Sequence, residues 1–394
     1  MEAKNYPSRK KVVMLVLPDL SGGGAERTSL NIQKYLDPNK FEVLLAPLQM
    51  RGNYLDSTFY QPKTVSTNSF FTWLSFKFKR DSLTRGFTQI FVLRTLIRRY
   101  QPDIVMTSMI DCSAPLACCW KLLPNIRKNT RWIVREGNNT SAVLNNAFSS
   151  NLKRTCIKKL ITWTYQQSDH VIVTTDGVAT ELSHVFQIPN SMISVIQNPV
   201  DLEIINLAIL KPPPKNLPKR FIIAVGRLSW QKGFDVLLEA FARLRQNELD
   251  LVILGEGPEE QNLRQMCNAL NIQNKVHFLG FLDNPWAVMH KAELFCFTSR
   301  WEGFGHVIVE AMACGTPVIA SDCPFGPANI IKNSSNGVLV PRNAPNEIRA
   351  AIFDLINDSK KIESIKGAGF KRAKHFSAKK VTQDYARVFE VNKS

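Results

Sequence analysis

The chain has 394 residues, of which 44% are hydrophobic and 21% charged, and its formal net charge is +17. This length allows two domains of ordinary size, and the composition is that of a soluble globular protein, not of a disordered or fibrous chain. The closest approach to a membrane span, residues 104–120, is interrupted by Asp111 and falls short of about 20 apolar residues.

Short apolar runs alternate with helical patterns through the first half of the chain. Helices are predicted at 25–36, 87–100 and 176–186. Alternation of this kind implies a parallel sheet with helices on both faces, and therefore an α/β fold. The runs that predict strands are residues 12–18, 41–48, 102–109, 131–136, 169–175 and 194–201.

Proline and lysine mark a change of character at residues 201–219, which include KPPPKNLPKR. Such a segment is typical of a stiff surface linker. We therefore expect an N-terminal Rossmann-like domain at 1–200 and a C-terminal one at 201–375, facing each other across a ligand-binding cleft. The second domain restarts the strand pattern at 220–227, 249–258, 276–282, 294–299 and 316–322.

The stretch RWEGFGHVIVEAMACGTPVIASD, residues 300–322, holds two glutamates beside a glycine-rich turn. A turn of this kind, followed by a helix, directs backbone amides and the positive end of the helix at an anion. Glu302 and Glu310 cannot bind phosphate themselves, but they suit the hydroxyls of a sugar and of a ribose. Because Glu310 lies in an apolar run, we expect it to be buried. The expected amide donors are Phe304, Gly305, His306 and Val307, and Gly303 is a further expected contact of the ligand.

Arg227 and Lys232 follow the first strand of the second half, in GRLSWQKGF. Two cations on one loop can bracket a diphosphate, although the same pair also fits two ordinary surface charges. Gly23 and Gly24, in LSGGGAERTSL, open a helix and bring backbone amides near the donor diphosphate or the acceptor. Phe281 is a further expected contact of the nucleotide sugar.

The sequence contains no Asp-x-Asp pair, so we expect neither a metal ion nor another cofactor at the diphosphate. Arg227, Lys232 and helix N-termini then have to meet its charge. The eight cysteines show no paired metal spacing, and we interpret them as reduced core residues of a cytoplasmic protein.

Much of the positive charge is concentrated in residues 77–159, which hold 16 Lys or Arg and 4 Asp or Glu. Just before it, residues 70–80 contain five aromatic and three basic side chains. This mixture favours peripheral association with an anionic membrane surface, on its cytoplasmic face. The alternatives are a solvated basic face and a nucleic-acid surface, and no nucleic-acid motif accompanies the charge.

These motifs together resemble one family, the retaining glycosyltransferases of family 4, which have the two-domain GT-B fold. The resemblance runs from about residue 12 to 390 and is carried by SGGGAERT, VIQNPVD, VGRLSWQKGF, LVILGEGP, the 300–322 stretch and CPFGPANII. It is greatest for the branch that builds capsule, O-antigen or other surface polysaccharide on a lipid carrier.

The resemblance implies α-linked transfer of a hexose or N-acetylhexosamine from a nucleotide diphosphate sugar, with uridine as the base, to a glycan or polyprenyl-diphosphate-linked acceptor. It implies that Arg227 and Lys232 bind the diphosphate, Glu310 the ribose and Glu302 the transferred sugar. It also implies that the C-terminal helix, 376–394, crosses back to complete the first domain.

The sequence departs from the family at two places. Arg135 and Glu136 stand where many relatives have a histidine, so Glu136 is expected to shape the donor sugar site or assist the acceptor, unless it only pairs with Arg135. Asn329 stands where relatives often carry glutamate. His170 lies inside a strand pattern and is expected to be structural.

Two other functions fit the same residues. A GT-B-type sugar-nucleotide epimerase would use acidic or histidine side chains in the cleft without an acceptor. A non-catalytic protein would bind the nucleotide sugar only.

Overall fold

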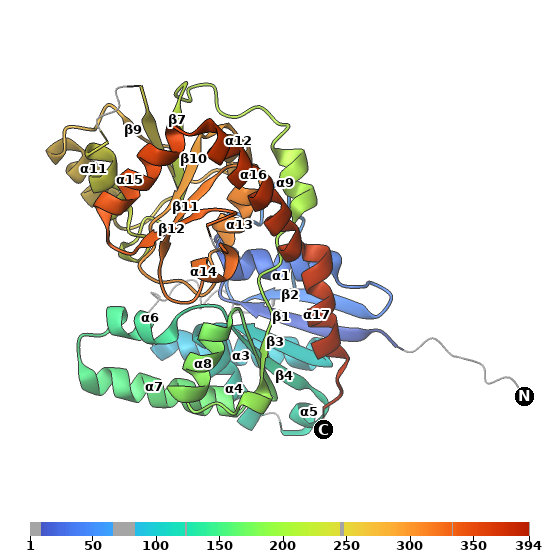
Figure 1. Cartoon of the computed structure of the whole chain (residues 1–394). Coiled ribbons are helices and arrows are strands. Elements are labelled where there is room, and N and C mark those ends of the chain that lie inside the picture. Colours follow the sequence, from blue (N-terminus) through green and yellow to red (C-terminus); the bar gives the residue numbers. More distant parts are fainter. Residues whose placement is uncertain (1–8, 66–82, 123, 245–247, 333, 394) are drawn as a thin grey trace, which may run out of the picture.

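Two parallel six-stranded sheets form the two halves of the chain in the computed structural model (Figure 1). The structure describes residues 9–65, 83–122, 124–244, 248–332 and 334–393. The strands of the first sheet, in the order β2-β1-β3-β4-β5-β6, are β1 Lys11–Leu17, β2 Phe41–Pro47, β3 Ile104–Ser108, β4 Arg131–Glu136, β5 His170–Val173 and β6 Ile193–Val195. Those of the second, in the order β12-β11-β10-β7-β8-β9, are β7 Phe221–Val225, β8 Asp250–Leu254, β9 Val276–Phe278, β10 Leu294–Phe297, β11 Val318–Asp322 and β12 Val338–Pro341.

Helices cover both faces of each sheet, which explains why the strands are continuous apolar runs. Along β1, Val13 and Leu15 face one hydrophobic core, whereas Met14 and Val16 face another. The helices of the first half are α1 Gly24–Tyr35, α3 Leu83–Tyr100, α4 Ile110–Lys121, α5 Pro124–Asn129, α6 Thr140–Ala147, α7 Asn151–Gln166 and α8 Asp176–His184. Those that follow are α9 Leu202–Ala208, α10 Phe234–Ala242, α11 Glu260–Ala269, α12 Pro285–Lys291, α13 His306–Ala313, α14 Pro327–Ile330, α15 Pro345–Ile356, α16 Ser359–Ala373 and α17 Ala378–Glu390.

The predicted α/β class with two Rossmann-like units is confirmed. In the first sheet the strand order reverses between β1 and β3, and in the second between β7 and β10. Ligands of doubly wound sheets bind at the carboxyl ends of strands at such reversals. The loops after β1, β7 and β10 are therefore the places where a site is expected.

The segment 201–219 is only in part the extended linker that its proline content predicts. Its first residues form α9, whose N-terminus is capped by the Asp201 side chain, which accepts from Ile204 N. Ile204 and Ile205 are buried, because α9 packs against α12 and α13. Strand β12 was not predicted, since four residues at the edge of the sheet give little periodicity.

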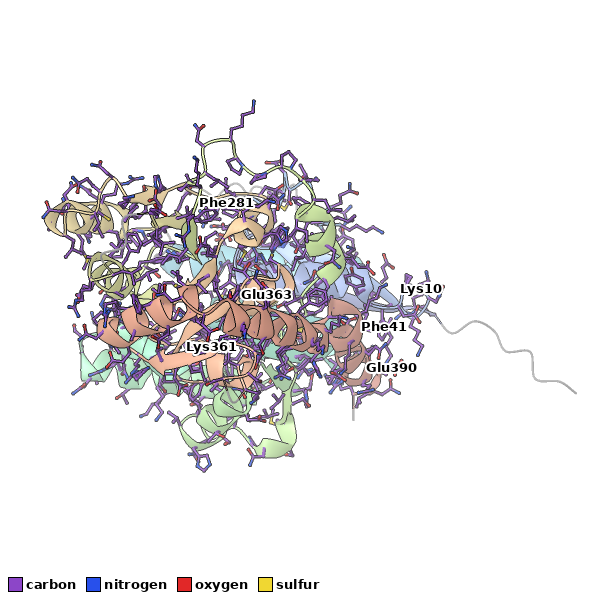
Figure 2. All side chains as sticks on the ribbon, turned by 45° about the horizontal axis from the view of Figure 1, so that its top comes forward. Lys10, Phe41, Phe281, Lys361, Glu363 and Glu390 are labelled. Carbon is purple, nitrogen blue, oxygen red and sulfur yellow. The ribbon has the colours of Figure 1, made fainter. Side chains whose placement is uncertain are left out.

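The last helix returns to the first half of the chain, where α17 packs on α1 (Figure 1). Phe389 meets Phe41 edge to face at 6.2 Å between ring centroids, and Lys11 Nζ donates to Glu390 O at 2.9 Å. Lys10, Phe41 and Glu390 accordingly appear together at one end of the molecule in Figure 2. Because α17 covers the first sheet, residues 378–390 contribute to the core of the opposite half of the sequence.

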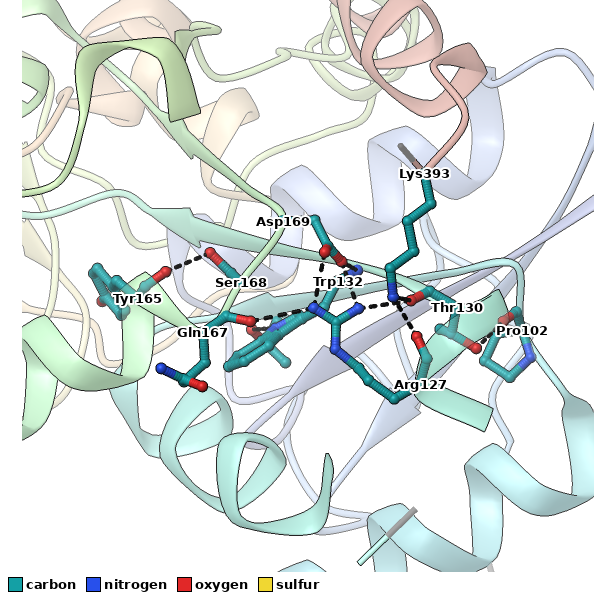
Figure 3. A network of polar contacts seen from close by, with 10 residues as sticks. Pro102, Arg127, Thr130, Trp132, Tyr165, Gln167, Ser168, Asp169 and Lys393 are labelled. Atoms are coloured by element: carbon teal, nitrogen blue, oxygen red, sulfur yellow. Dashed lines mark hydrogen bonds and ion pairs between the residues drawn. The ribbon is translucent and has the colours of Figure 1, made fainter. Parts of the chain in front are cut away.

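A polar network fixes the chain beyond α17 to the first sheet (Figure 3). Both guanidinium ends of Arg127 reach Asp169, at 2.7 and 2.8 Å, and Trp132 N donates to the same carboxylate at 2.7 Å. Lys393 Nζ donates to the carbonyl oxygen of Thr130 at 3.1 Å. Asp169 is therefore the acceptor on which three donor groups depend.

Replacing Asp169 with alanine is expected to lower the free energy of unfolding by about 2–3 kcal/mol, because charged hydrogen bonds are lost and a backbone amide is left unsatisfied. Urea unfolding followed by circular dichroism measures this. The matched control is Asp384→Ala, which breaks an exposed pair with Arg387 and should cost about 0.5 kcal/mol. Equal losses in the free energy of unfolding for the two variants would contradict the role of Asp169 as the central acceptor of this network.

The cysteines are free, as predicted, and six of the eight are buried. Cys118 and Cys156 are exposed, which corrects the expectation that the cysteines belong to the core. His170 lies in β5, where its Nε2 contacts Ser194 Oγ at 2.9 Å and burial lowers its pKa.

Candidate active site

The loops at the carboxyl ends of the two sheets face each other and are in contact. Thr174, after β5, donates its hydroxyl to the carbonyl oxygen of Gly303, after β10, at 2.8 Å. Ser57, beyond β2, donates to Asp283 at 2.7 Å, and Arg27 of α1 forms an ion pair with Glu310 of α13. Gly303 and Glu310, which the sequence singles out in the second half, therefore lie where the two halves of the chain meet.

The loop between β10 and α13 carries the two predicted glutamates. Glu310 is 2% exposed, as its apolar neighbours predict, and Glu302, whose burial was not predicted, is 9% exposed. Gly305 is the N-cap residue of α13 with a φ of +94°, a conformation that disfavours side chains. It turns the chain so that the first amides of the helix, from His306 onward, point toward the interface. The Phe304 ring packs against Phe376 and belongs to the core, so only its backbone can serve a ligand.

Lys232 and Glu302 are brought together by the loops after β7 and β10. Their side chains form an ion pair, and Ser299 Oγ donates to the same carboxylate at 3.1 Å. Lys232 Nζ also lies 5.7 Å from the centre of the Phe297 ring. Arg227, on the same loop as Lys232, is exposed and forms no recorded side-chain contact within the described residues. Within the part of the chain that the structure describes, this loop therefore offers one cation with an ion-pair partner, Lys232, and one without, Arg227.

Glu310 is held from across the interface. Its Oε1 accepts from Arg27, whose guanidinium also lies over the rings of Tyr54 and Trp286 at 5.9 and 5.6 Å. Its Oε2 is buried and has no hydrogen-bond partner among the described residues. A buried carboxylate oxygen without a donor is costly, so a hydroxyl group at this position would be favourable.

His306 stands beside Glu310 and is also incompletely satisfied. Its Nε2 is 3.6 Å from Glu310 Oε1, whereas Nδ1 is buried without a partner in the part of the chain that the structure describes. Burial lowers the pKa of His306 to about 4, so the ring is neutral at physiological pH. A neutral imidazole can donate or accept one hydrogen bond at Nδ1.

The glycine loop after β1 lies opposite this helix. A Cβ added to Gly24 would lie 4.0 Å from His306 Nδ1, and one added to Gly22 would lie 3.1 Å from the Phe281 ring. Phe281 is labelled in Figure 2. Gly23, Gly24, Phe281 and His306 are thus gathered at the interface, on the loops after β1, β9 and β10.

Glu136 lies at the end of β4 and is engaged by its own half of the chain. Its Oε2 accepts from Tyr165 Oη at 2.6 Å, its Oε1 accepts from Asn138 N at 3.0 Å, and burial raises its pKa. Arg135 does not pair with it within the described residues but donates to Asn198, Tyr385 and Thr28. Asn329 turns back to donate to Phe325 O.

Two residues at this interface, and one at the end of β3 in the first half, were missed from the sequence. Arg27 and Glu26 lie on α1, directly after the glycines, and both are buried. Their signal was a pair of charges in the first turn of an otherwise buried helix. Met109, between β3 and α4, has a φ of +67°, which is strained for a residue with a side chain. No feature of the sequence predicts this backbone conformation at Met109.

The described residues contain no group of three or more His, Cys, Asp or Glu side chains with the geometry of a metal site. Metal independence remains a prediction.

Comparisons with known proteins agree with the motifs. Residues 22–204 match the family described as "Glycosyltransferase Family 4", and residues 207–372 match "Glycosyl transferases group 1". One relative is the N-acetylgalactosamine-N,N'-diacetylbacillosaminyl-diphospho-undecaprenol 4-alpha-N-acetylgalactosaminyltransferase of Campylobacter jejuni, 32% identical over 255 residues, which are 63% of this chain and 69% of the relative. Another is the lipopolysaccharide 1,6-galactosyltransferase of Salmonella typhimurium, 35% identical over 37% of this chain and 41% of that protein.

Among solved structures, HepE of Anabaena in complex with UDP and glucose superposes with a TM-score of 0.75 over 96% of this chain and 99% of that one. At 20% sequence identity this likeness establishes the fold, which is GT-B. Fold, family matches and the relative from Campylobacter jejuni lead to the same conclusion: the chain belongs to the group 1, family 4 glycosyltransferases and is an enzyme of the transferase class.

Proposed function

We propose that this protein is a retaining glycosyltransferase that moves a hexose or N-acetylhexosamine from a UDP-sugar to a glycan or lipid-linked acceptor in surface polysaccharide synthesis, without a metal ion. The observation that carries the proposal is the group of side chains at the reversal point of the second sheet. Arg227 and Lys232 follow β7, while Glu302 and Glu310 flank the glycine turn after β10. Cations for a diphosphate and carboxylates for hydroxyls are thereby combined in one place.

The unsatisfied groups at the interface fit such a donor. The free Oε2 of Glu310 is suited to accept from a ribose hydroxyl, and Nδ1 of His306 is suited to a further polar group. Glu302, next to Lys232, is suited to a hydroxyl of the transferred sugar. Arg227 and Lys232, with the first amides of α13, would meet the charge of the leaving diphosphate.

The proposed chemistry forms a bond between the acceptor oxygen and the anomeric carbon on the face from which UDP departs. The bond from that carbon to the phosphate oxygen breaks, and this oxygen takes the proton of the acceptor hydroxyl. The configuration of the donor is thereby kept, and free UDP is the second product. A product of the opposite anomeric configuration would overturn retention.

Support for the acceptor class comes from the relatives' names, since one acts on a diphospho-undecaprenol-linked sugar and another on lipopolysaccharide. An acceptor of this class is presented at a membrane.

The first experiment is a thermal-shift panel of UDP-, GDP- and ADP-sugars with the purified chain. A ligand at 100 times its dissociation constant stabilises by about 2.7 kcal/mol, and we expect this for at least one UDP-sugar, with or without EDTA. A panel without any shift would contradict the proposal. Incubation with the bound donor alone distinguishes the epimerase, which would change the sugar, from the transferase, which would only hydrolyse it slowly.

We also propose that the basic face of the first half contacts an anionic membrane surface. On α7, Leu152 is 74% exposed beside the exposed Lys153, Lys158 and Lys159. On α3, Phe91 is exposed beside Arg98 and Arg99. The aromatic segment 70–80 lies outside the described residues. Among the residues that are described, no helix combines the length and the apolar character needed to cross a bilayer.

The double substitution Lys153→Ala and Lys159→Ala is expected to weaken binding to vesicles of anionic lipid by about 30-fold, since each lysine contributes about 1 kcal/mol. Co-sedimentation with phosphatidylglycerol vesicles measures this at low salt. The control is Lys360→Ala with Lys361→Ala, two exposed lysines of α16 in the second half. A loss as large in the control as in the α7 variant would refute the assignment of this face.

A further inference from the structure

One acidic side chain at the interface is buried without a partner from another residue. Glu26 lies in the first turn of α1 and is 7% exposed. Among the described residues it forms no ion pair, and its carboxyl accepts a hydrogen bond from its own backbone amide. A carboxylate that is largely removed from water, with only its own backbone amide as a donor, is unfavourable, so this arrangement calls for a functional reason.

Four titratable or charged groups face the Glu26 carboxyl. Asp19 approaches from the end of β1, Tyr54 from the segment after β2, Arg135 from the end of β4, and Arg27 is its neighbour on α1. Both arginines favour the charged form of Glu26, but within the described residues neither forms an ion pair with it, because they bind elsewhere. Their recorded partners are Glu310 and Tyr54 for Arg27, and Asn198, Tyr385 and Thr28 for Arg135.

The environment of Glu26 disfavours its charge. Burial raises its pKa from 4.5 to about 7, and the nearby Asp19 acts in the same direction. The carboxyl therefore exchanges its proton close to neutral pH. Both carboxyl oxygens of Glu26 can accept hydrogen bonds from hydroxyl groups once a ligand or a higher pH favours the ionised form.

The position of the carboxyl is set by the glycine loop. A Cβ added to Gly23 would lie 2.5 Å from Glu26 Oε2, so the carboxyl rests directly on the Gly23 backbone. The next residue, Gly24, faces His306 of the second half. Glu26 is thus at the reversal point of the first sheet, whereas Arg227, Lys232 and the flanking glutamates belong to the second.

We propose that Glu26 is an acceptor-positioning residue, whose ionised carboxylate accepts hydrogen bonds from hydroxyl groups of the acceptor sugar. This inference rests on the proposed transferase function. Hydroxyl groups would supply hydrogen-bond donors to Glu26, which receives none from other described residues. Its two carboxylate oxygens are held on one helix, α1, and can therefore orient a sugar ring. The acceptor hydroxyls would reach the carboxylate from the loop side of β1.

The test uses membranes from a strain in which the gene is deleted, since they hold the natural acceptor. Purified protein and a radiolabelled UDP-sugar chosen from the thermal-shift panel are added, and the membrane concentration is varied. Glu26→Gln is expected to raise the apparent KM for the acceptor by about tenfold, with UDP affinity within twofold of wild type. The control Glu42→Gln changes an exposed carboxylate of β2 and should alter neither value.

The pH profile separates positioning from a structural role. For the wild type, kcat/KM for the acceptor should rise with pH through about 7, as Glu26 loses its proton, and Glu26→Gln should lack this rise. The pKa of Glu26 is about 7 in the folded protein and 4.5 in the unfolded chain. Because the folded state binds the proton more tightly, the free energy of unfolding of the wild type falls as the pH rises from 4.5 to about 7. Glu26→Gln should therefore melt higher than wild type at pH 8.

Gly23→Ala is a second variant that keeps the charge but displaces it. The Gly23 backbone, with φ −83° and ψ 176°, tolerates alanine, so the new methyl group pushes only the Glu26 carboxyl. It should raise the acceptor KM as Glu26→Gln does. If Glu26→Gln and Gly23→Ala both showed the acceptor KM and the pH profile of the wild type, the inference would be overturned. If the wild type itself binds no UDP-sugar or labels no membranes, the proposed function falls instead.

Discussion

Replacing Lys232 with alanine is expected to lower kcat/KM for the UDP-sugar by about 1,000-fold. Lys232 is one of two cations on the loop after β7, and its ammonium group is the one enclosed by Glu302 and the Phe297 ring. In that setting little water is available to stabilise the charge of the departing diphosphate once the Lys232 ammonium group has been removed. The loss should appear in kcat as well as in KM, because the charge that Lys232 offsets increases as the bond to the sugar breaks.

The same substitution should also change the free protein. Glu302 is 9% exposed and would keep only Ser299 as a side-chain partner, which destabilises the fold by about 1–3 kcal/mol. Adding Glu302→Gln to Lys232→Ala should restore much of this stability without restoring activity. Calorimetric unfolding and donor turnover measure the two effects separately.

Lys291→Ala, an exposed lysine at the end of α12, is the matched control and should be neutral for both stability and turnover. Activity of Lys232→Ala within threefold of wild type would show that the diphosphate is bound elsewhere.

Gly303→Ala is expected to reduce activity by about 100-fold or more through a clash between the two halves. A Cβ at this position would lie 1.9 Å from the carbonyl oxygen of Gly137 and 2.7 Å from Asn138 N. Both are backbone atoms of the loop after β4, so no rotamer change can relieve the overlap. The halves must separate, and the hydrogen bond from Thr174 to Gly303 O is lost.

The core of each half should be unaffected by Gly303→Ala, because the clash lies at the contact between them. We therefore expect a melting temperature close to that of wild type, together with a larger radius of gyration in X-ray scattering. Gly367→Ala in α16, where nothing lies within 4 Å of the new methyl group, is the control and should be active. Thr174→Val, which removes the hydrogen bond without a clash, should be intermediate. Full activity in Gly303→Ala would mean that this contact is dispensable.

Two ion pairs, one within the second half and one between the halves, occupy groups that the proposed donor requires. Lys232 pairs with Glu302, and Arg27 with Glu310, so each carboxylate already has one cationic partner. Diphosphate binding would compete for Lys232, whereas the free Oε2 of Glu310 leaves room for a hydroxyl without breaking the Arg27 pair. These two pairs connect the donor loops with each other and with the first half.

Local patterns in the sequence determined the secondary structure and much of the candidate site. Strands such as β1 and β7 were predicted because strands buried on both faces are apolar over nearly all of their length, and this pattern is complete within five to seven residues. Glu302 and Glu310 were found for a similar reason, since two charges in an apolar, glycine-rich stretch stand out locally. The burial of Glu310 followed from its neighbours in the chain.

Only the tertiary structure decided which residues meet across the interface. Arg27 and Glu310 are 283 positions apart, and their pairing depends on the docking of two separately formed sheets. The surroundings of Glu136 and Glu26 also depend on the tertiary structure. Tyr165 donates a hydrogen bond to Glu136. Arg135 and Arg27 bind other partners, so Glu26 has no ion-pair partner among the described residues. Periodicity records whether a side chain faces a core, but hydrogen-bond partners across domains depend on orientation, which no local pattern encodes.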